Sequence, residues 1–184
     1  MRIITPLFLS ACGASLGPGK FPGNPVDATF TDPDGVERTY PSALHIRRFE
    51  GPDCAAATWY EVFNSDFGVR FAVPDAGGPA TFEAGETSIV RWDDQALGTP
   101  PMFLHGGTGT ASSNDDTHFA YEITGAEVRY QDWDTDEDVA YPQPAPIVVR
   151  FEGAFGTFET EELDGVPSFA TDADGTPLCG DPGA

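Results

Sequence analysis

Hydrophobic residues alternate with polar ones along most of the chain from Val26 onward, which is the pattern of a β-strand with one buried face. The clearest case is the run in which Val69, Phe71 and Val73 fall on one face and Arg70 falls on the other. Such runs recur with turn residues between them, so we expect about ten to twelve short strands. The expected strands are residues 26–30, 36–40, 44–49, 59–63, 69–73, 80–82, 87–92, 101–104, 118–124, 127–131, 147–152 and 155–159.

Turn-forming residues separate these runs and indicate how the strands connect. Asp32-Pro33-Asp34-Gly35 suits a tight turn, and Gly125-Ala126 and Gly153-Ala154 are each expected to join two strands into a hairpin. Residues 54–58 and 93–97 have helical character over about one turn each. Many short strands at a spacing of about 8–12 residues predict an all-β fold. We expect an antiparallel β-sandwich of jelly-roll or Ig-like type, with a β-barrel as the alternative.

The N-terminus has a short apolar segment that ends in a cysteine. Residues 3–9 are largely apolar and lead into Leu9-Ser10-Ala11-Cys12. This tetrapeptide resembles the lipobox of prokaryotic lipoproteins, in which a signal peptidase cleaves before the cysteine and the cysteine is acylated. The resemblance implies a signal peptide over residues 1–11, lipidation of Cys12 and a membrane anchor through that lipid. Gly13 in place of an aspartate implies outer-membrane or cell-surface placement.

The segment after the cysteine is rich in glycine and proline, so we expect residues 12–25 to form a flexible tether. Residues 26–184 are expected to form a single β-sandwich domain, since the chain has 184 residues. Within the tether, the residues around Ser15 match the G-x-S-x-G elbow of serine hydrolases. They lack the preceding strand and following helix of that motif, so Ser15 is not expected to be a nucleophile. No other apolar run approaches the ~18 residues that a membrane-spanning helix needs.

Two cysteines remain once Cys12 is assigned to lipidation. An even pair in an exported chain predicts a disulfide between Cys54 and Cys179. This bond would fix the C-terminal segment to the body of the protein.

Acidic residues greatly outnumber basic ones, with 30 Asp and Glu against 9 Lys and Arg and a formal net charge of −21. Nucleic-acid binding needs clustered basic side chains, so nucleic acid is excluded as a partner. The same deficit argues against adsorption to an anionic membrane through a basic patch. Hydrophobic residues make up 40% of the chain, which is enough for a core, so the acidity describes a surface rather than disorder.

The densest acidic segment is Asp132-Trp133-Asp134-Thr135-Asp136-Glu137-Asp138. If it continues as a strand, its four aspartates, at a spacing of two, share one face and repel one another. If it curls into a loop, the same carboxylates can converge on a hard cation, and calcium is the natural occupant. The segment is not an EF-hand, because Glu137 stands where that loop needs glycine and Gln143 where it needs glutamate. A calcium site at Asp132, Asp134, Asp136 and Asp138 and a solvated acidic loop both remain open.

Other candidate ligand-binding residues lie beside aromatic or flexible segments. Trp133 is walled in by aspartates and is the best candidate to stack on a sugar ring, since carbohydrate sites combine aromatic faces with carboxylates and amides. Asp115 and Asp116, with Asn114, follow a flexible glycine-rich run and can close over a ligand. His105 and His118 flank this segment, thirteen residues apart, which suggests zinc with Asp116 as a further ligand. No ligand pair at short spacing supports that site, so the histidines are expected to be ordinary surface or core residues.

The sequence contains no metalloprotease, nucleotide-binding or nucleophile-base motif with the spacing that its chemistry requires. It therefore favours a lipid-anchored extracytoplasmic binding or structural module over an enzyme, with a glycan or a protein as the partner. A calcium-assisted carbohydrate-binding domain is the leading alternative, and a secreted hydrolase is the third.

Overall fold

The computed structural model describes residues 24–31, 35–64, 67–83, 102–132, 135, 137–140, 147–156 and 160–183. These residues form an all-β structure, as the alternating pattern predicts. No helix able to cross a membrane occurs within the described ranges. The strands are β1 (Asn24–Thr31), β2 (Glu37–Gly51), β3 (Cys54–Phe63), β4 (Gly68–Pro74), β5 (Ala80–Phe82), β6 (Met102–His105), β7 (Thr108–Asn114), β8 (His118–Asp132), β9 (Glu137–Ala140), β10 (Ile147–Ala154), β11 (Glu161–Asp164), β12 (Val166–Thr171) and β13 (Pro177–Gly180).

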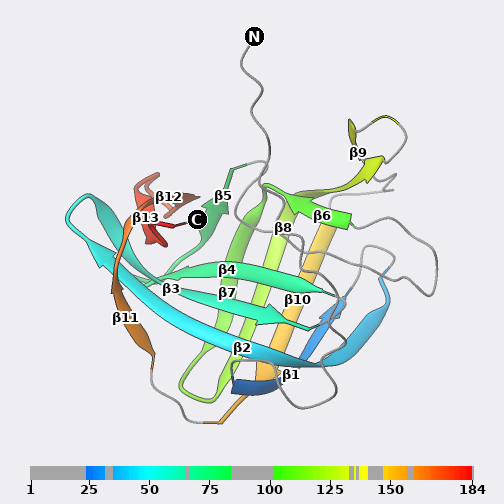
Figure 1. Cartoon of the computed structure of the whole chain (residues 1–184), viewed down its shortest axis with the longest axis horizontal. Helices are drawn as coiled ribbons and strands as arrows, with labels where there is room; N and C mark the ends of the chain where they lie inside the picture. The colour runs from blue at the N-terminus through cyan, green and yellow to red at the C-terminus, as the bar shows by residue number, and fades with distance from the viewer. Residues whose placement is uncertain are drawn as a thin grey trace.

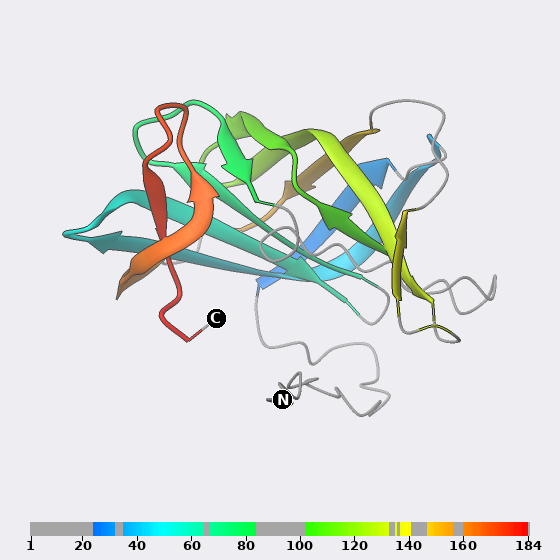
Figure 2. The ribbon, with the colours of Figure 1, turned by 90° about the horizontal axis from the view of Figure 1, so that it is seen from above.

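The strands belong to one connected sheet whose pairings return to their starting strand. Neighbours follow the order β2-β1-β10-β8-β7-β5-β12-β13-β3, and β3 in turn pairs with β2. β4 continues this sheet beyond β3, β11 lies beside β2, and β6 and β9 pair with the second half of β8. Figure 1 shows the consequence, since β2, β3 and β4 cross in front of β7, β8 and β10. The two layers are seen from above in Figure 2.

The main core lies between these two layers and is built on aromatic side chains. Phe71 of β4 faces inward, and its ring centroid lies 4.3 Å from that of Tyr121 and 5.7 Å from that of Phe119, both on β8. Tyr60 of β3 stacks on the same ring at 5.2 Å. Val69 and Val73 are buried beside Phe71, as their alternation with Arg70 predicts. Each such burial stabilises the fold by about 1.5–3 kcal/mol before entropy is counted.

The buried core extends to the other face of β2 and β3, beneath the C-terminal strands. Phe49 and Trp59 are almost fully buried there. The indole Nε1 of Trp59 donates a hydrogen bond of 2.7 Å to the carbonyl oxygen of Cys179. Cys179 also forms the predicted disulfide with Cys54, which confirms that pairing. The C-terminal segment is therefore held over this part of the core by a covalent bond as well as by packing.

Three predictions about connections are wrong. β8 runs without interruption through Gly125, which has φ of 72° and is the extra residue of a β-bulge opposite β10. β10 likewise continues through Gly153, where a Cβ atom would lie 2.7 Å from the ring of Phe119. Both glycines therefore serve a bend or a close approach within a strand rather than a hairpin turn. β2 is also one strand where two were expected, because Pro41 pairs with β1 without ending it.

Three further differences concern local structure and direction. Residues 54–58 belong to β3 and not to a helical turn, because pairing with β2 and β4 overrides their helical preference. The flexible run predicted at residues 106–110 is a turn at Gly106 and Gly107 followed by the start of β7. The sheet is mixed rather than purely antiparallel, since β11 pairs with β2 and β13 with β3 in parallel.

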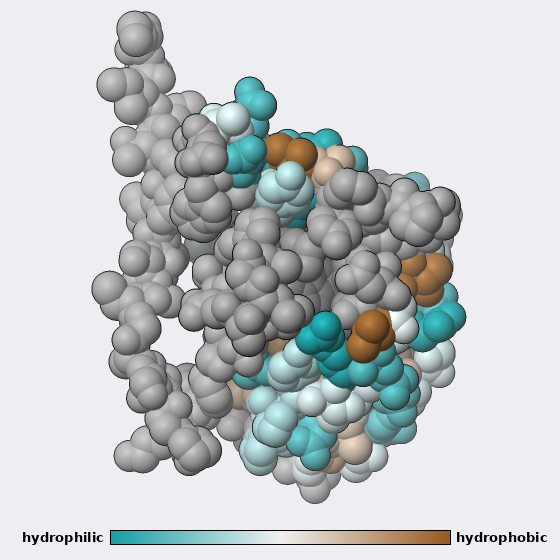
Figure 3. Space-filling view, turned by 90° about the vertical axis from the view of Figure 1, so that its right-hand side faces the viewer, coloured by the Kyte–Doolittle hydropathy of each residue, from teal (hydrophilic) through white to brown (hydrophobic). Residues whose placement is uncertain are grey.

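The described surface is mainly hydrophilic, and its exposed apolar residues are scattered. Figure 3 shows one face, on which the few brown apolar residues lie apart from one another, each with hydrophilic residues beside it. The large hydrophobic residues that are exposed in the described ranges are Val36, Val148, Val166 and Phe169. Isolated apolar residues of this kind are normal for a protein surface and do not mark a partner.

Candidate functional site

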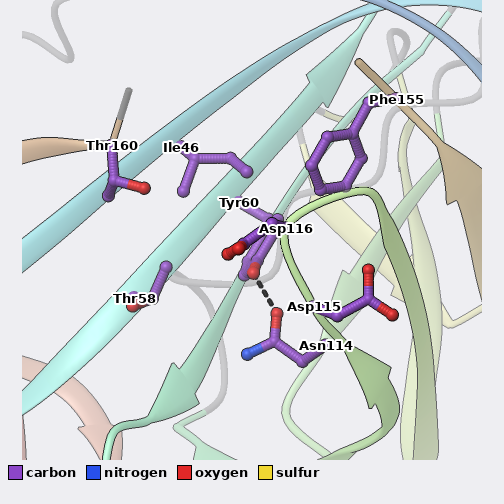
Figure 4. Close-up of a pocket in the computed structure, with 8 residues that line it drawn as sticks. All are labelled: Ile46, Thr58, Tyr60, Asn114, Asp115, Asp116, Phe155 and Thr160. Carbon is purple, nitrogen blue, oxygen red and sulfur yellow. Dashed lines mark hydrogen bonds between the residues drawn. The ribbon is translucent and has the colours of Figure 1, made fainter. Parts of the chain in front are cut away.

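A polar cavity of about 200 Å³ lies where the layer of β2 and β3 meets the turn after β7 (Figure 4). Five separate segments of the chain contribute to it, so it exists only in the folded protein. Its lining comprises Ile46 of β2, Thr58 and Tyr60 of β3, Asn114 at the end of β7, Asp115 and Asp116 of the following turn, Phe155 after β10 and Thr160 before β11.

Tyr60 connects this cavity to the core. Its ring is buried against Phe71, while its hydroxyl donates a hydrogen bond to Oδ1 of Asn114. Burial raises the pKa of Tyr60 to about 12, and the nearby carboxylates of Asp115 and Asp116 act in the same direction. The phenol is therefore neutral at physiological pH. Its oxygen can accept one further hydrogen bond, and the amide nitrogen of Asn114 can donate to a ligand.

Asp115 holds the shape of the turn between β7 and β8. One of its carboxylate oxygens accepts hydrogen bonds from the amide of Thr117 at 2.8 Å, the hydroxyl of Thr117 at 3.0 Å and the amide of His118 at 2.9 Å. These bonds favour the charged carboxylate and lower the pKa of Asp115 below its ordinary value. Asp115 thus fixes the loop that presents its neighbours to the cavity.

Asp116 has no such internal role. It is exposed, and it forms no hydrogen bond or ion pair with any residue that the structure describes. Its carboxylate remains available to a molecule in the cavity.

The rim of the cavity includes a neutralised cation. Thr58 donates to Asp75 at 3.3 Å, and the other carboxylate oxygen of Asp75 accepts from Nε of Arg48 at 2.6 Å. Arg48 also pairs with Glu50 at 3.0 Å. Because the described lining contains two carboxylates and no basic side chain, the cavity disfavours anions.

The structure places the sequence-predicted residues unevenly. Asp115 and Asp116 line the cavity together, whereas Cys12 and Trp133 lie outside the described residues. Asp132 and Asp138 flank the β8–β9 hairpin, and since Asp132 faces Glu137 and Asp138 faces Gln131, the two aspartates point to opposite faces.

The calcium hypothesis stays a prediction. Asp134 and Asp136 also lie outside the described ranges. Within those ranges no three His, Cys, Asp or Glu side chains are grouped to hold a metal ion.

Sequence reasoning missed Tyr60, Thr58, Phe155 and Thr160. Each lies in or next to a strand, with no local motif, and reaches the cavity only through strand pairing. The amide and carboxylates of residues 114–116 gave the one local signal, a polar cluster after a glycine-rich run.

Comparison of the chain with protein-family models, with curated protein sequences and with solved structures finds no significant match.

Proposed function

We propose that this protein is a lipid-anchored extracytoplasmic binding module that takes a small, neutral, hydroxyl-rich ligand, such as one sugar residue, into the cavity beside Tyr60. The observation that supports this best is the grouping of the Tyr60–Asn114 pair with the exposed carboxylate of Asp116.

The chemistry of the lining favours this ligand class. Asp116 can accept hydrogen bonds from hydroxyl groups, the amide of Asn114 can donate to them, and the hydroxyls of Thr58 and Thr160 can do both. Phe155 contributes an apolar ring against which the carbon face of a ligand can pack. The volume of about 200 Å³ is below the ~300–1,000 Å³ of sites for drug-sized ligands, which favours a single small ring.

The proposed localisation is supported by the sequence and by one structural feature. The lipobox-like residues that end at Cys12, and the glycine- and proline-rich sequence between Cys12 and β1, support an anchor in the outer membrane or at the cell surface. The disulfide is consistent with this proposal, because such bonds persist in oxidising compartments.

A glycan array followed by calorimetry on the glycans that bind tests the proposed function. Replacing Asn114 or Asp116 with alanine should weaken binding about tenfold, since each removes a hydrogen bond worth about 1–3 kcal/mol to the ligand. Asp174→Ala is the matched control, because this exposed aspartate lies in the turn between β12 and β13, outside the cavity lining. Absence of glycan binding, or binding that survives both cavity substitutions, would show that the cavity is not a saccharide site.

A further inference from the structure

Three side chains on the outer face of the sheet form a continuous line of hydrogen bonds. The hydroxyl oxygen of Ser113 lies 3.1 Å from Nδ1 of His118, and Nε2 of the same ring lies 3.3 Å from a carboxylate oxygen of Glu152. A hydroxyl, an imidazole and a carboxylate in this order are the parts of an activated serine.

Strand register explains why these residues meet. Ala120 of β8 lies between Ser113 of β7 and Glu152 of β10 in one cross-strand row. His118 lies two residues before Ala120, so its side chain projects from the same face. Phe119 is buried on the other face, and the three polar residues are directed away from the core.

The local backbone holds two of the three residues in place. The pairing of β7 with β8 has a bulge between Ala111 and Ser113, and bulges re-aim side chains near functional sites. The backbone amide of His118 donates to Asp115, which anchors the imidazole at the end of the turn. Ser113, His118 and Glu152 are therefore held on paired strands and not on a free loop.

In the neutral imidazole, the hydrogen bonds select one tautomer. A carboxylate can only accept, so Nε2 of neutral His118 must bear the proton that is donated to Glu152. Nδ1 is then unprotonated and accepts the hydroxyl proton of Ser113. This is the arrangement in which an imidazole serves as general base for a serine.

The neighbouring charges leave this arrangement intact. Arg150 and Glu122 lie on the same outer face in the adjacent row, and they neutralise each other through a bond of 2.6 Å. Carboxylates also lie near His118 among the described residues. Asp115 interacts electrostatically with the imidazole, and Asp27 of β1 lies in the same cross-strand row as His118, with Ala154 of β10 between them.

We propose that Ser113 is a nucleophile for acyl transfer, with His118 as general base and Glu152 as a positioning residue, and that the protein hydrolyses small carboxylic esters. The site is distinct from the cavity, because the next residue, Asn114, projects to the opposite face. Ser113 and His118 are both half-buried and the side chain of Glu152 is 68% exposed, so the three groups lie at the protein surface. Flexible or terminal ester groups therefore suit the site better than buried ones.

The reaction balances with water as the only co-substrate. The Ser113 oxygen bonds to the ester carbonyl carbon while its proton passes to Nδ1 of His118. The bond between that carbon and the alkoxy oxygen breaks, and the imidazolium returns the proton to the leaving alcohol. Water then attacks the acyl carbon while the imidazole again accepts a proton. The bond between that carbon and the Ser113 oxygen breaks, and the imidazolium returns the proton to this oxygen, which releases the carboxylic acid and restores Ser113.

A fluorophosphonate probe tests the proposal on the full chain, with the labelled residue located by peptide mass spectrometry. Ser112 is the matched control, because this adjacent serine donates to the carbonyl oxygen of Ala120 and has no imidazole partner. We expect labelling at Ser113 to be about 100-fold faster than at Ser112, which is within the usual contribution of a general base. His118→Gln should remove that difference, and hydrolysis of p-nitrophenyl acetate should fall in parallel.

Glu152 needs a readout that packing alone would not change. Nitrogen NMR of the His118 ring should show the Nε2-protonated tautomer in the native protein and a mixture of tautomers in Glu152→Ala, with slower labelling. Equal labelling of the two serines, or labelling of Ser113 that persists in His118→Gln, would overturn the proposal. Circular dichroism checks that each variant is folded. A loss of labelling in a folded variant can then be assigned to loss of the hydrogen bonds that join Ser113, His118 and Glu152.

Discussion

Tyr60 joins two environments through the two ends of one side chain. Its ring belongs to the aromatic core on Phe71, and its hydroxyl lies at the cavity with Asn114. A ligand that bonds to this hydroxyl would therefore act directly on a core residue. The same burial makes ionisation of the phenol costly, and this has a measurable effect on stability.

The pKa of Tyr60, raised to about 12, predicts how stability falls at alkaline pH. Because the folded state holds the proton more tightly than the unfolded state, this contribution is complete below about pH 10 and is lost as the pH rises through about 12. When the pH is raised from about 9 to about 11, the free energy of unfolding should fall by about 1 kcal/mol more in the unsubstituted protein than in the Tyr60→Phe variant. Urea unfolding at the two pH values measures this difference, and parallel losses in both proteins would contradict it.

Single residues also show why part of the candidate site was predictable. The cluster of Asn114, Asp115 and Asp116 is visible in the sequence, because three polar residues lie shortly after a glycine-rich run. The sequence does not show that Asp115 stabilises the turn while Asp116 faces the cavity, because this difference depends on which carboxylate accepts hydrogen bonds from the amides of the turn. Ser113 and His118 are five positions apart, and only the pairing of β7 with β8 brings their side chains together.

At the scale of elements, strand identity was more predictable than strand connection. The alternation of Val69, Phe71 and Val73 follows from burial of one face, which local sequence determines. Gly125 and Gly153 were misread as turns because a glycine permits both a turn and a close approach within a strand. Which of these occurs depends on contacts from distant strands, such as the ring of Phe119 against Gly153.

The disulfide shows how much one covalent link between elements contributes. It joins the start of β3 to β13 across a sequence separation of 125 residues. Replacing both Cys54 and Cys179 with serine should lower the free energy of unfolding by about 2–5 kcal/mol, since a long loop becomes free in the unfolded chain. Urea unfolding checks this value. Cys12→Ser is the control and should leave the midpoint unchanged, and an unchanged midpoint in the double variant would contradict the expectation.

For the whole molecule, ion pairs at the sheet surface balance part of the acidic charge. Arg47 lies opposite Glu161 in the parallel pairing of β2 with β11, and it also contacts Asp181. Arg70 lies opposite Glu61 across β3 and β4 at 3.2 Å, and its guanidinium also lies 4.6 Å from the ring of Trp59. Solvent-accessible pairs of this type contribute little stability each, and the acids in excess of the basic residues keep the surface hydrated.

The proposed anchor predicts where the whole molecule resides. Cells that express the full chain should incorporate labelled palmitate into it, and the protein should sediment with membranes. Cys12→Ala should abolish the labelling and shift the protein to the soluble fraction, because two or more acyl chains are needed for stable attachment. Labelling that persists in Cys12→Ala would refute the lipoprotein assignment.

The closed series of strand pairings determines how late in synthesis the protein can finish folding. A chain is synthesised from its N-terminus, yet β12 and β13 must insert between β5 and β3 before the pairings close. Until then, Phe49 and Trp59 lack the C-terminal segment that buries them. The nascent protein therefore exposes two large aromatic residues until its final strands arrive, and a chain truncated before β12 should be prone to aggregation.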